Sequence, residues 1–196
     1  MKKSALFTAL FIFTVSIYSI APSKEPGDVA DDFTLPGTDS KNYSLNDELS
    51  SGRTVVVMFW STQCPFVQAY HERAKELYNS FKDKGISIWA VNANSTESMQ
   101  DAANHASEHS YAFPMLKDAE NKVADMLGAQ RTPEVYVISK DRVILYHGRI
   151  DDNKDALLVT STDLKNALNE ITSSKDVSTK ITKSFGCTIK RKGGDN

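Results

Sequence analysis

The sequence is sparing in cysteine, glycine and proline. Its 196 residues include two cysteines, nine glycines and six prolines, without internal repeats or low-complexity segments. The absence of these features argues against a repeat array or a low-complexity chain. What remains, 40% hydrophobic and 24% charged residues, is typical of one ordinary globular domain with short additions.

Positive charge is not in excess either, with 23 lysines and arginines against 25 aspartates and glutamates. The formal net charge is −2, and Lys2 and Lys3 are the only charged residues among the first 21, so the remaining residues carry −4. The short basic run at 190–192 is typical of a solvated terminus rather than a binding patch. We therefore expect no nucleic-acid partner. The sequence also has no flavin or nicotinamide fingerprint, so we expect no cofactor.

An apolar segment follows the two N-terminal lysines and runs from residue 5 to residue 21. A positive start before a short apolar run predicts a secretory signal, and the small side chains of Ser19 and Ala21 suit a cleavage site. Pro22 suits it poorly, so the alternative is attachment to the inner membrane through residues 1–21, whose apolar stretch at 5–21 is slightly shorter than the ~20 residues that span a bilayer. Both alternatives export the protein to the periplasm or the exterior, where disulfides persist.

The rest of the chain divides into a linker at 22–29, a domain at 30–172 and a C-terminal tail at 173–196. Hydrophobic periodicity predicts strands at 53–60, 86–91, 135–138 and 142–146, helices at 65–84, 95–109, 120–127 and 163–171, and short extended pieces at 33–35, 42–45 and 113–116. This alternation predicts an α/β fold, with a central mixed sheet flanked by helices and an N-terminal β extension.

Cys64 stands in a context that favours a reactive thiol over a structural one. It closely follows the apolar strand at 53–60, and Pro65 begins the next helix in a position that proline tolerates. Unpaired N–H groups at a helix start stabilise a thiolate, the nucleophilic form of cysteine. The alternative, a buried and inert cysteine, fits this strand–cysteine–proline–helix context less well.

The residues around Cys64 resemble those of a known family. Residues 59–65, Phe-Trp-Ser-Thr-Gln-Cys-Pro, resemble the Phe-Trp-Ala-x-x-Cys-Pro segment of the thioredoxin-like redoxins. That group holds extracytoplasmic thiol-disulfide oxidoreductases and the alkyl hydroperoxide reductase/thiol-specific antioxidant proteins. The segments at 64–70, 148–152 and 186–190 together resemble a redoxin subfamily with a Cys-Pro-Tyr-Val site and a C-terminal Gly-Cys motif. The likeness covers about residues 30–192 and implies a thioredoxin-like fold.

The resemblance implies a set of residues around the active cysteine. Thr132 and Pro133 match the family's threonine and cis-proline, which face that cysteine and hold extended substrate chains. The substrate-binding residues implied in this way are Trp60, Ser61, Pro65, Arg131, Thr132 and Pro133, with no metal among them. Arg131 is a candidate to polarise a peroxide, and the alternative is an ordinary surface cation.

The chain departs from the family pattern near Cys64. Val67 replaces the second cysteine of the usual Cys-x-x-Cys pair, and Met58 stands where thioredoxins have a buried acid. Val57 and Ser61 replace the proline and threonine of the peroxidase signature. These departures leave the fold intact and put the peroxide pocket in question.

Cys187 is the other thiol of the chain, and its partner decides the function. As a resolving thiol it pairs with Cys64, and the alternatives are a free tail cysteine or a link between two chains. The leading hypothesis is an exported oxidoreductase in which Cys64 attacks a protein or small-molecule disulfide and Cys187 releases the product. The first alternative is a thiol peroxidase acting on a peroxide through Cys64, and the second is a non-catalytic binding module. Either enzyme draws on an external thiol reductant.

Other polar residues give weaker signals. His71 lies two helical turns from Cys64, too far to act as its base. His105 and His109 are spaced i, i+4, which suits a metal, but with no third ligand evident a solvated face is favoured. For Glu134 the alternatives are a proton carrier and an ordinary strand-start residue, and we favour the latter.

Overall fold

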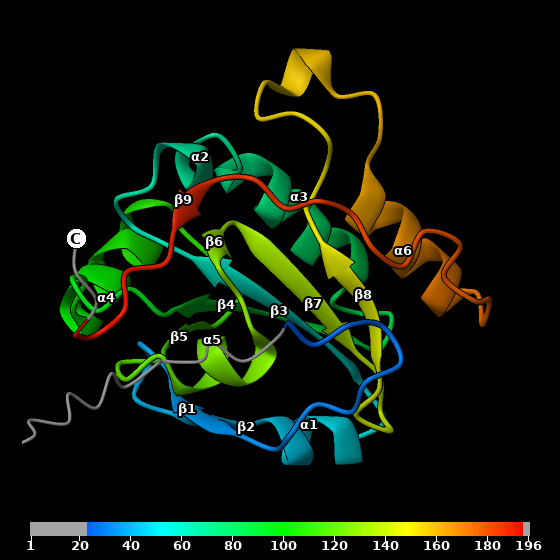
Figure 1. Ribbon diagram of the computed structural model, residues 1–196, viewed down its shortest axis with the longest axis horizontal. Coiled ribbons are helices and arrows are strands. Elements are labelled where there is room, and N and C mark those ends of the chain that lie inside the picture. The colour runs from blue at the N-terminus through cyan, green and yellow to red at the C-terminus, as the bar shows by residue number, and fades with distance from the viewer. Residues whose placement is uncertain (1–22, 194–196) are drawn as a thin grey trace, which may run out of the picture.

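A five-stranded mixed sheet forms the centre of the protein (Figure 1). The computed structural model describes residues 23–193, so the predicted export segment at 1–21 lies outside the described residues. The strands stand in the order β5 (Met115–Lys117), β4 (Ile86–Asn92), β3 (Thr54–Trp60), β7 (Glu134–Ile138) and β8 (Ile144–Gly148). β3, β4 and β5 are parallel, whereas β7 and β8 run antiparallel to their neighbours. The predicted α/β fold with a mixed sheet is therefore confirmed.

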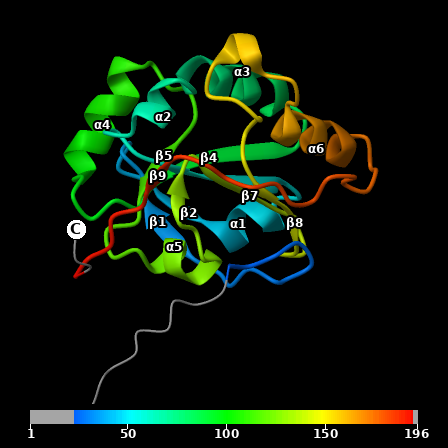
Figure 2. The same ribbon diagram turned by 45° about the horizontal axis from the view of Figure 1, so that its top comes forward.

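Both faces of the sheet are covered, which explains the continuous apolar run of β3. Val56, Met58 and Trp60 point into one core, and Val55 and Val57 point into the other. The first core is closed by α3 (His71–Phe81), α4 (Met99–Glu108) and α6 (Asp163–Thr172). The second is closed by α1 (Leu45–Ser50) and α5 (Lys122–Leu127), as Figure 2 shows. The site therefore rests on a strand that cannot shift without disturbing two cores.

The helix predicted at 65–84 is interrupted. It consists of α2 (Pro65–Gln68) and α3, with Tyr70 between them. The Tyr70 N–H bonds to the Val67 carbonyl three residues back, which tightens the turn. The Tyr70 ring is buried, and its hydroxyl donates to Asp151 at 2.7 Å, so a tertiary contact holds the break.

The other predicted elements are present with shifted ends, and short unpredicted elements, among them α1 and a 3₁₀ turn, join them. β1 (Thr34–Pro36) and β2 (Asn42–Ser44) form the predicted N-terminal hairpin, followed by the unpredicted short helix α1. α4 begins later than expected because Ser98 and Asp101 form a capping box. Gly128, with φ 77°, ends α5. A 3₁₀ turn, η1 (Ala156–Leu158), projects from the loop before α6.

Both described ends of the chain lie along the sheet. The N–H groups of Lys24 and Gly27, in the segment interpreted as a linker, bond to carbonyls of Leu127 and Ile144 at 2.9 Å each. The C-terminal tail runs beside β8, where it bonds on both sides of His147, and then crosses to α2 (Figure 1). There β9 (Cys187–Thr188) pairs with β6 (Arg131–Thr132). None of the helices within residues 23–193 has the length and apolar character needed to cross a bilayer.

Candidate active site

Cys64 lies where β3 passes into α2. Its backbone is extended (φ −83°, ψ 117°), and it occupies the N-cap of α2, as the sequence predicts. The side chain is 2% exposed, and its Sγ donates to the carbonyl oxygen of Thr132 at 3.2 Å. The backbone N–H of Val67 bonds to the sulfur from the first turn of α2. Because α2 is only four residues long, such local N–H groups, more than a helix dipole, stabilise a thiolate here.

The tail brings the second cysteine to the same place. The Thr132–Pro133 peptide bond is cis, as expected from the resemblance. Thr132 is paired with Cys187 between the antiparallel strands β6 and β9, so their Cα atoms lie only ~4.5–5.5 Å apart. Gly186 permits this approach, because its φ is 146° and an added Cβ would collide with the Thr132 carbonyl group. The sequence-distant Cys187 is thus brought beside Cys64.

The two free thiols set each other's protonation. Burial raises the pKa of Cys64, but hydrogen bonds from Cys187, Thr132 and backbone N–H groups outweigh it and hold the pKa below the ordinary 9.0. Burial and the neighbouring Cys64 raise the pKa of Cys187 to about 11. The buried Thr132 hydroxyl has no other partner among the described residues and is available to a thiolate. Cys64 is therefore the more acidic thiol, and Cys187 is its hydrogen-bond donor.

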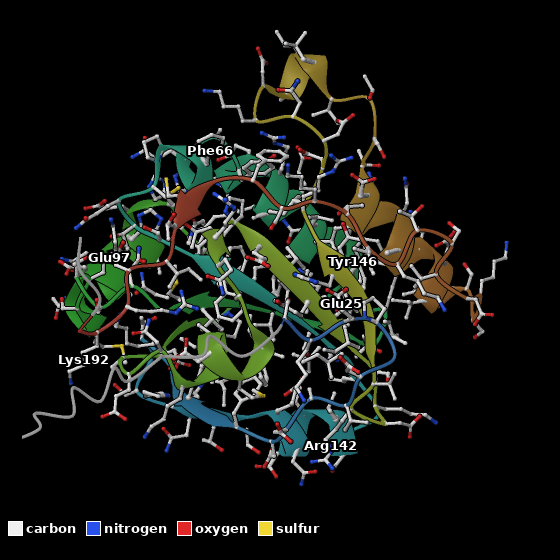
Figure 3. All side chains as sticks on the ribbon, in the orientation of Figure 1. Glu25, Phe66, Glu97, Arg142, Tyr146 and Lys192 are labelled. Atoms are coloured by element: carbon white, nitrogen blue, oxygen red, sulfur yellow. The ribbon has the colours of Figure 1, made fainter. Side chains whose placement is uncertain are left out.

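A buried carboxylate fixes the loop that leads to Cys64. Glu97, beside the start of α4 (Figure 3), is 2% exposed. It accepts hydrogen bonds from the Ser61 hydroxyl at 2.5 Å, the Thr62 N–H at 2.7 Å, and the side-chain amides of Asn92 and Asn94 at 2.5 and 2.6 Å. Burial raises the pKa of Glu97, but these hydrogen bonds lower it by more than burial raises it. The net pKa of Glu97 therefore lies below its usual value. The loop is thus anchored to an ionised group.

The same network binds the tail. Lys117 is buried and donates to the side-chain oxygen of Asn92 and the carbonyl oxygen of Asn94, both at 2.7 Å. The Asn94 side-chain oxygen accepts the N–H of Lys190 at 2.7 Å. Sequence reasoning missed this network. The sequence feature that points to it is the group Asn92, Asn94 and Glu97 at and just after the end of the fully buried strand β4. This is the edge of the sheet where α/β proteins place their chemistry.

Glu134 fixes the loop on the other side of the site. One carboxylate oxygen accepts the N–H groups of Gln130 and Arg131 at 2.9 and 2.8 Å. The other lies 2.8 Å from Nε2 of His147, and the side chain is almost fully buried. Glu134 is the first residue of β7, as interpreted from the sequence, and it also holds the loop that precedes the cis peptide bond.

Half of the residues predicted to bind substrate lie at the sulfur. Thr132 bonds to Cys64, Pro133 follows it across the cis bond, and Pro65 begins α2. Pro65 is exposed, whereas Thr132 and Pro133 are buried. The structure therefore brings these three residues together around Cys64.

The other three residues predicted to bind substrate have hydrogen-bond partners away from the Cys64 sulfur. Trp60 is fully buried, and its indole N–H donates to the hydroxyl of Tyr111 at 3.2 Å. The Ser61 hydroxyl is taken up by the buried carboxylate network. Arg131 is exposed, and its guanidinium donates to the carbonyl oxygen of Gly186 at 3.3 Å. These side chains support the loop and the tail, and their polar groups bind partners other than the sulfur.

Comparison with known proteins identifies the family. The model of the AhpC/TSA family matches residues 26–147, more than half of the chain. The chain belongs to the AhpC/TSA family. The resemblance seen around Cys64 is thereby confirmed, and with it the redoxin group.

Proteins similar to this AhpC/TSA-family chain include named thiol-disulfide oxidoreductases and solved structures of the same fold. The thiol-disulfide oxidoreductase ResA of Bacillus cereus (strain ATCC 10987 / NRS 248) is 25% identical over 168 residues, covering 80% of this chain and 95% of the relative. The structure of a hypothetical protein from Sinorhizobium meliloti 1021 matches with a TM-score of 0.80 and 31% identity, covering 88% of this chain and 98% of that one. The thioredoxin domain of a thiol-disulfide oxidoreductase from Bacteroides vulgatus matches at 0.57 and 23%, over 64% of this chain and 89% of that domain, which supports the fold. The chain is an oxidoreductase with a thioredoxin-like fold, and the predicted thiol–disulfide chemistry is confirmed.

Proposed function

We propose that this protein exchanges thiols with disulfides through a pair formed by Cys64 and Cys187. The observation that supports this most directly is the register between β6 and β9, which sets Cys187 opposite the residue that binds the Cys64 sulfur. Val67, at the position of the usual second local cysteine, is buried in the core. The tail therefore supplies the thiol that the local motif lacks.

The reaction begins with the Cys64 thiolate. It attacks one sulfur of a substrate disulfide R–S–S–R′, so that a Cys64–S–S–R bond forms and the substrate S–S bond breaks. The leaving group R′–S⁻ carries away the electron pair of the broken bond. The lowered pKa of Cys64 makes more thiolate available for this step than an ordinary thiol would supply at the same pH.

Cys187 completes the exchange. Once Cys64 is in the mixed disulfide, its negative charge no longer raises the pKa of Cys187, whose proton then passes to R′–S⁻. The Cys187 thiolate attacks the Cys64 sulfur, which forms the Cys64–Cys187 disulfide and releases R–S⁻. The substrate gains two electrons and the protein pair loses two. An external dithiol returns both electrons by the reverse exchange.

Substrate reaches the pair where α2 meets the tail. Phe66 lies on α2 (Figure 3). Its ring packs edge to face with that of Phe185, just before β9, with ring centroids 6.1 Å apart, and both residues are half-buried. Pro65 is exposed beside them. This apolar rim suits a protein or peptide disulfide, because aromatic rings at a surface bind apolar side chains next to the reacting sulfur.

The contacts give less support to a peroxidase. Ser61 stands at the place of the peroxidase threonine, but its hydroxyl donates to Glu97. The guanidinium of Arg131, the candidate to polarise a peroxide, donates to the Gly186 carbonyl instead. Both side chains are thus committed to partners other than a ligand at Cys64.

Reduction of insulin disulfides by dithiothreitol tests the proposal. The wild-type chain is expected to accelerate the reaction, Cys64→Ser is expected to leave only the uncatalysed rate, and Ser80→Ala, a change on α3 outside the pair, is expected to keep full activity. Rapid consumption of hydrogen peroxide by the wild type, with no effect on insulin, would favour the peroxidase. Equal rates for wild type and Cys64→Ser in both assays would favour the binding module.

We also propose that residues 1–21 export the domain, whether or not they are cleaved afterwards. Two lysines and an apolar run support this, as does a site with two neighbouring thiols, because disulfides persist outside the cytoplasm. A fusion of residues 1–29 to a reporter that is active only outside the cytoplasm should be active, and the fusion of residues 23–29 should not. An inactive long fusion would contradict export.

A further inference from the structure

Three of the four histidines gather between α3 and α4. His71 begins α3, His105 lies in α4, and His109 is the residue that caps α4. One ligand nitrogen of each histidine lies within 4.8 Å of the other two. His71 and His105 are buried and His109 is half-buried. The interpretation of His105 and His109 as a solvated pair without a third ligand is therefore wrong, because the fold adds His71.

The hydrogen bonds around His71 leave one of its nitrogens free. The indole N–H of Trp60, which can only donate, bonds to the hydroxyl oxygen of Tyr111 at 3.2 Å. That hydroxyl also bonds to Nδ1 of His71 and lies 3.4 Å from Nε2 of His105. All these groups are satisfied when His71 Nδ1–H donates to Tyr111 and the Tyr111 hydroxyl donates to His105. Nε2 of His71 then carries a lone pair, and it is buried without a hydrogen-bond partner.

A buried lone pair beside two further imidazoles matches the requirements of a transition metal. A metal-bound histidine usually donates its other N–H to an oxygen, which orients the ring, and Tyr111 has that role for His71. Imidazole nitrogen suits Zn²⁺, Cu²⁺ and Ni²⁺, and three histidines with one open position form a known type of zinc site. The set includes neither cysteine, so it is separate from the thiol pair.

We propose that His71, His105 and His109 bind a divalent transition-metal ion, with Zn²⁺ as the representative ligand. His71 supplies Nε2. His109 turns out of its stack on His71, where the ring centroids are 3.7 Å apart and the rings 15° from parallel, because stacked rings cannot direct two lone pairs at one ion. Its half-buried position at the end of α4 leaves room for this turn. The bound ion ties the start of α3 to the end of α4.

The charge around the cluster does not oppose a cation. Lys75 is the nearby cation, and its ammonium donates to the carbonyl oxygen of His109 at 3.4 Å. It is paired with Glu72 at 2.6 Å, which offsets its charge. Glu108 adds a further negative charge near His105.

Calorimetric titration of Zn²⁺ into the full chain, without an affinity tag, tests the site. Because thiolates also bind Zn²⁺, the chain with Cys64→Ser and Cys187→Ser is the parent for all variants. We expect one Zn²⁺ per parent chain with a micromolar or lower dissociation constant. Affinity should fall more than about tenfold in His109→Asn and in His105→Gln. His147→Gln, which changes the fourth histidine, is the matched control and should keep the affinity.

Co²⁺ gives a second readout that a misfolded variant cannot imitate. Its paramagnetism should broaden the amide resonances of α3 and of the end of α4 in the parent chain, and leave those of β9 sharp. A parent chain that binds no Zn²⁺, or histidine variants that bind it as tightly as the parent, would overturn the proposal. Broadening centred on β9 would do so as well. None of these outcomes depends on whether the thiol pair is catalytic.

Discussion

Cys64 and Cys187 are held by parts of the molecule that differ greatly in burial and in strand length. Cys64 follows the seven-residue strand β3 at the centre of the sheet, six of whose residues are buried, and it is itself 2% exposed. Cys187 lies on β9, a two-residue strand paired with another of two residues, and it is half-buried. One thiol is thus buried in the first core, and the other lies on a strap across the surface, which is the tail segment around β9.

The difference matches two requirements of thiol–disulfide exchange. The attacking thiol needs a fixed environment that stabilises its thiolate, whereas the resolving thiol has to make room for substrate and then return. Hydrogen bonds from backbone N–H groups nevertheless hold the strap in place on the C-terminal side of Cys187. The N–H groups of Ile189 and Lys190 bond to Gln130 and Asn94 just after β9, so Cys187 can swing only over a short range.

The strongest test of this division compares Cys64→Ser with Cys187→Ser. Cys64→Ser removes the first step, so turnover should fall at least about a thousandfold and no mixed disulfide should form. Cys187→Ser keeps the first step and should accumulate a mixed disulfide on Cys64, which intact mass measurement with oxidised glutathione detects. Equal labelling of the single thiol in both variants would remove the distinction between the two cysteines.

The position of the strap is tested next, with Gly186→Ala. A Cβ at residue 186 collides with the Thr132 carbonyl, so β9 must move away from β6, and release of the second product should slow by about 100-fold. Gly193→Ala is the control, since Gly193 also lies in the tail at positive φ (79°) but an added Cβ meets nothing within 4 Å. Rapid-quench single-turnover measurements resolve this step. The same slowing in both variants would point to tail strain and not to the β6–β9 contact.

The anchor shared by the loop and the strap is Glu97. Glu97→Gln leaves buried donors without an acceptor and removes one of the negative charges near Lys117, so the free energy of unfolding should fall by about 2–4 kcal/mol. Glu120→Gln removes a surface carboxylate paired with Lys122 and should change it by less than ~0.5 kcal/mol. Urea denaturation measures both. Similar small losses would mean that the buried network does not hold the two segments.

The smallest effect expected is on the pH profile of alkylation. Because the pKa of Cys64 is lowered, its alkylation by iodoacetamide should reach half its maximal rate at a lower pH than that of an ordinary thiol. In Cys187→Ala the hydrogen bond from the second thiol is lost, so this midpoint should move to higher pH. By linkage, ionised Cys64 stabilises the reduced protein above its unfolded-state pKa, and this contribution is lost as the pH falls through the folded-state pKa. An unchanged midpoint in Cys187→Ala would show that the two thiols do not interact.

Local sequence patterns predict most of the structure around Cys64. The apolar run of β3 and the proline after Cys64 place the thiol at a helix start, because strand burial and proline preference are local properties. The break at Tyr70 was not predicted, since it depends on a hydrogen bond to Asp151 far along the chain. A helical stripe of apolar residues continues through the break and conceals it.

Local sequence patterns do not predict the contacts made by the strap or by the buried carboxylates. The Gly-Cys motif near the end of the chain suggests a second thiol, but its place opposite Thr132 follows from a pairing between segments more than fifty residues apart. The same holds for Glu97 and for the joining of His71 to His105, whose neighbours come from separate elements. Sequence spacing alone does not bring such residues together, because tertiary packing decides their distance.

Disulfide mapping of the oxidised full chain tests the central claim most directly. The reduced protein is treated with one equivalent of diamide, quenched in acid, digested without reductant and measured by mass spectrometry. We predict one dominant linked peptide that joins Cys64 to Cys187, from protein that runs as a monomer on a non-reducing gel. Two free thiols, or cross-links between chains through Cys187, would contradict the account.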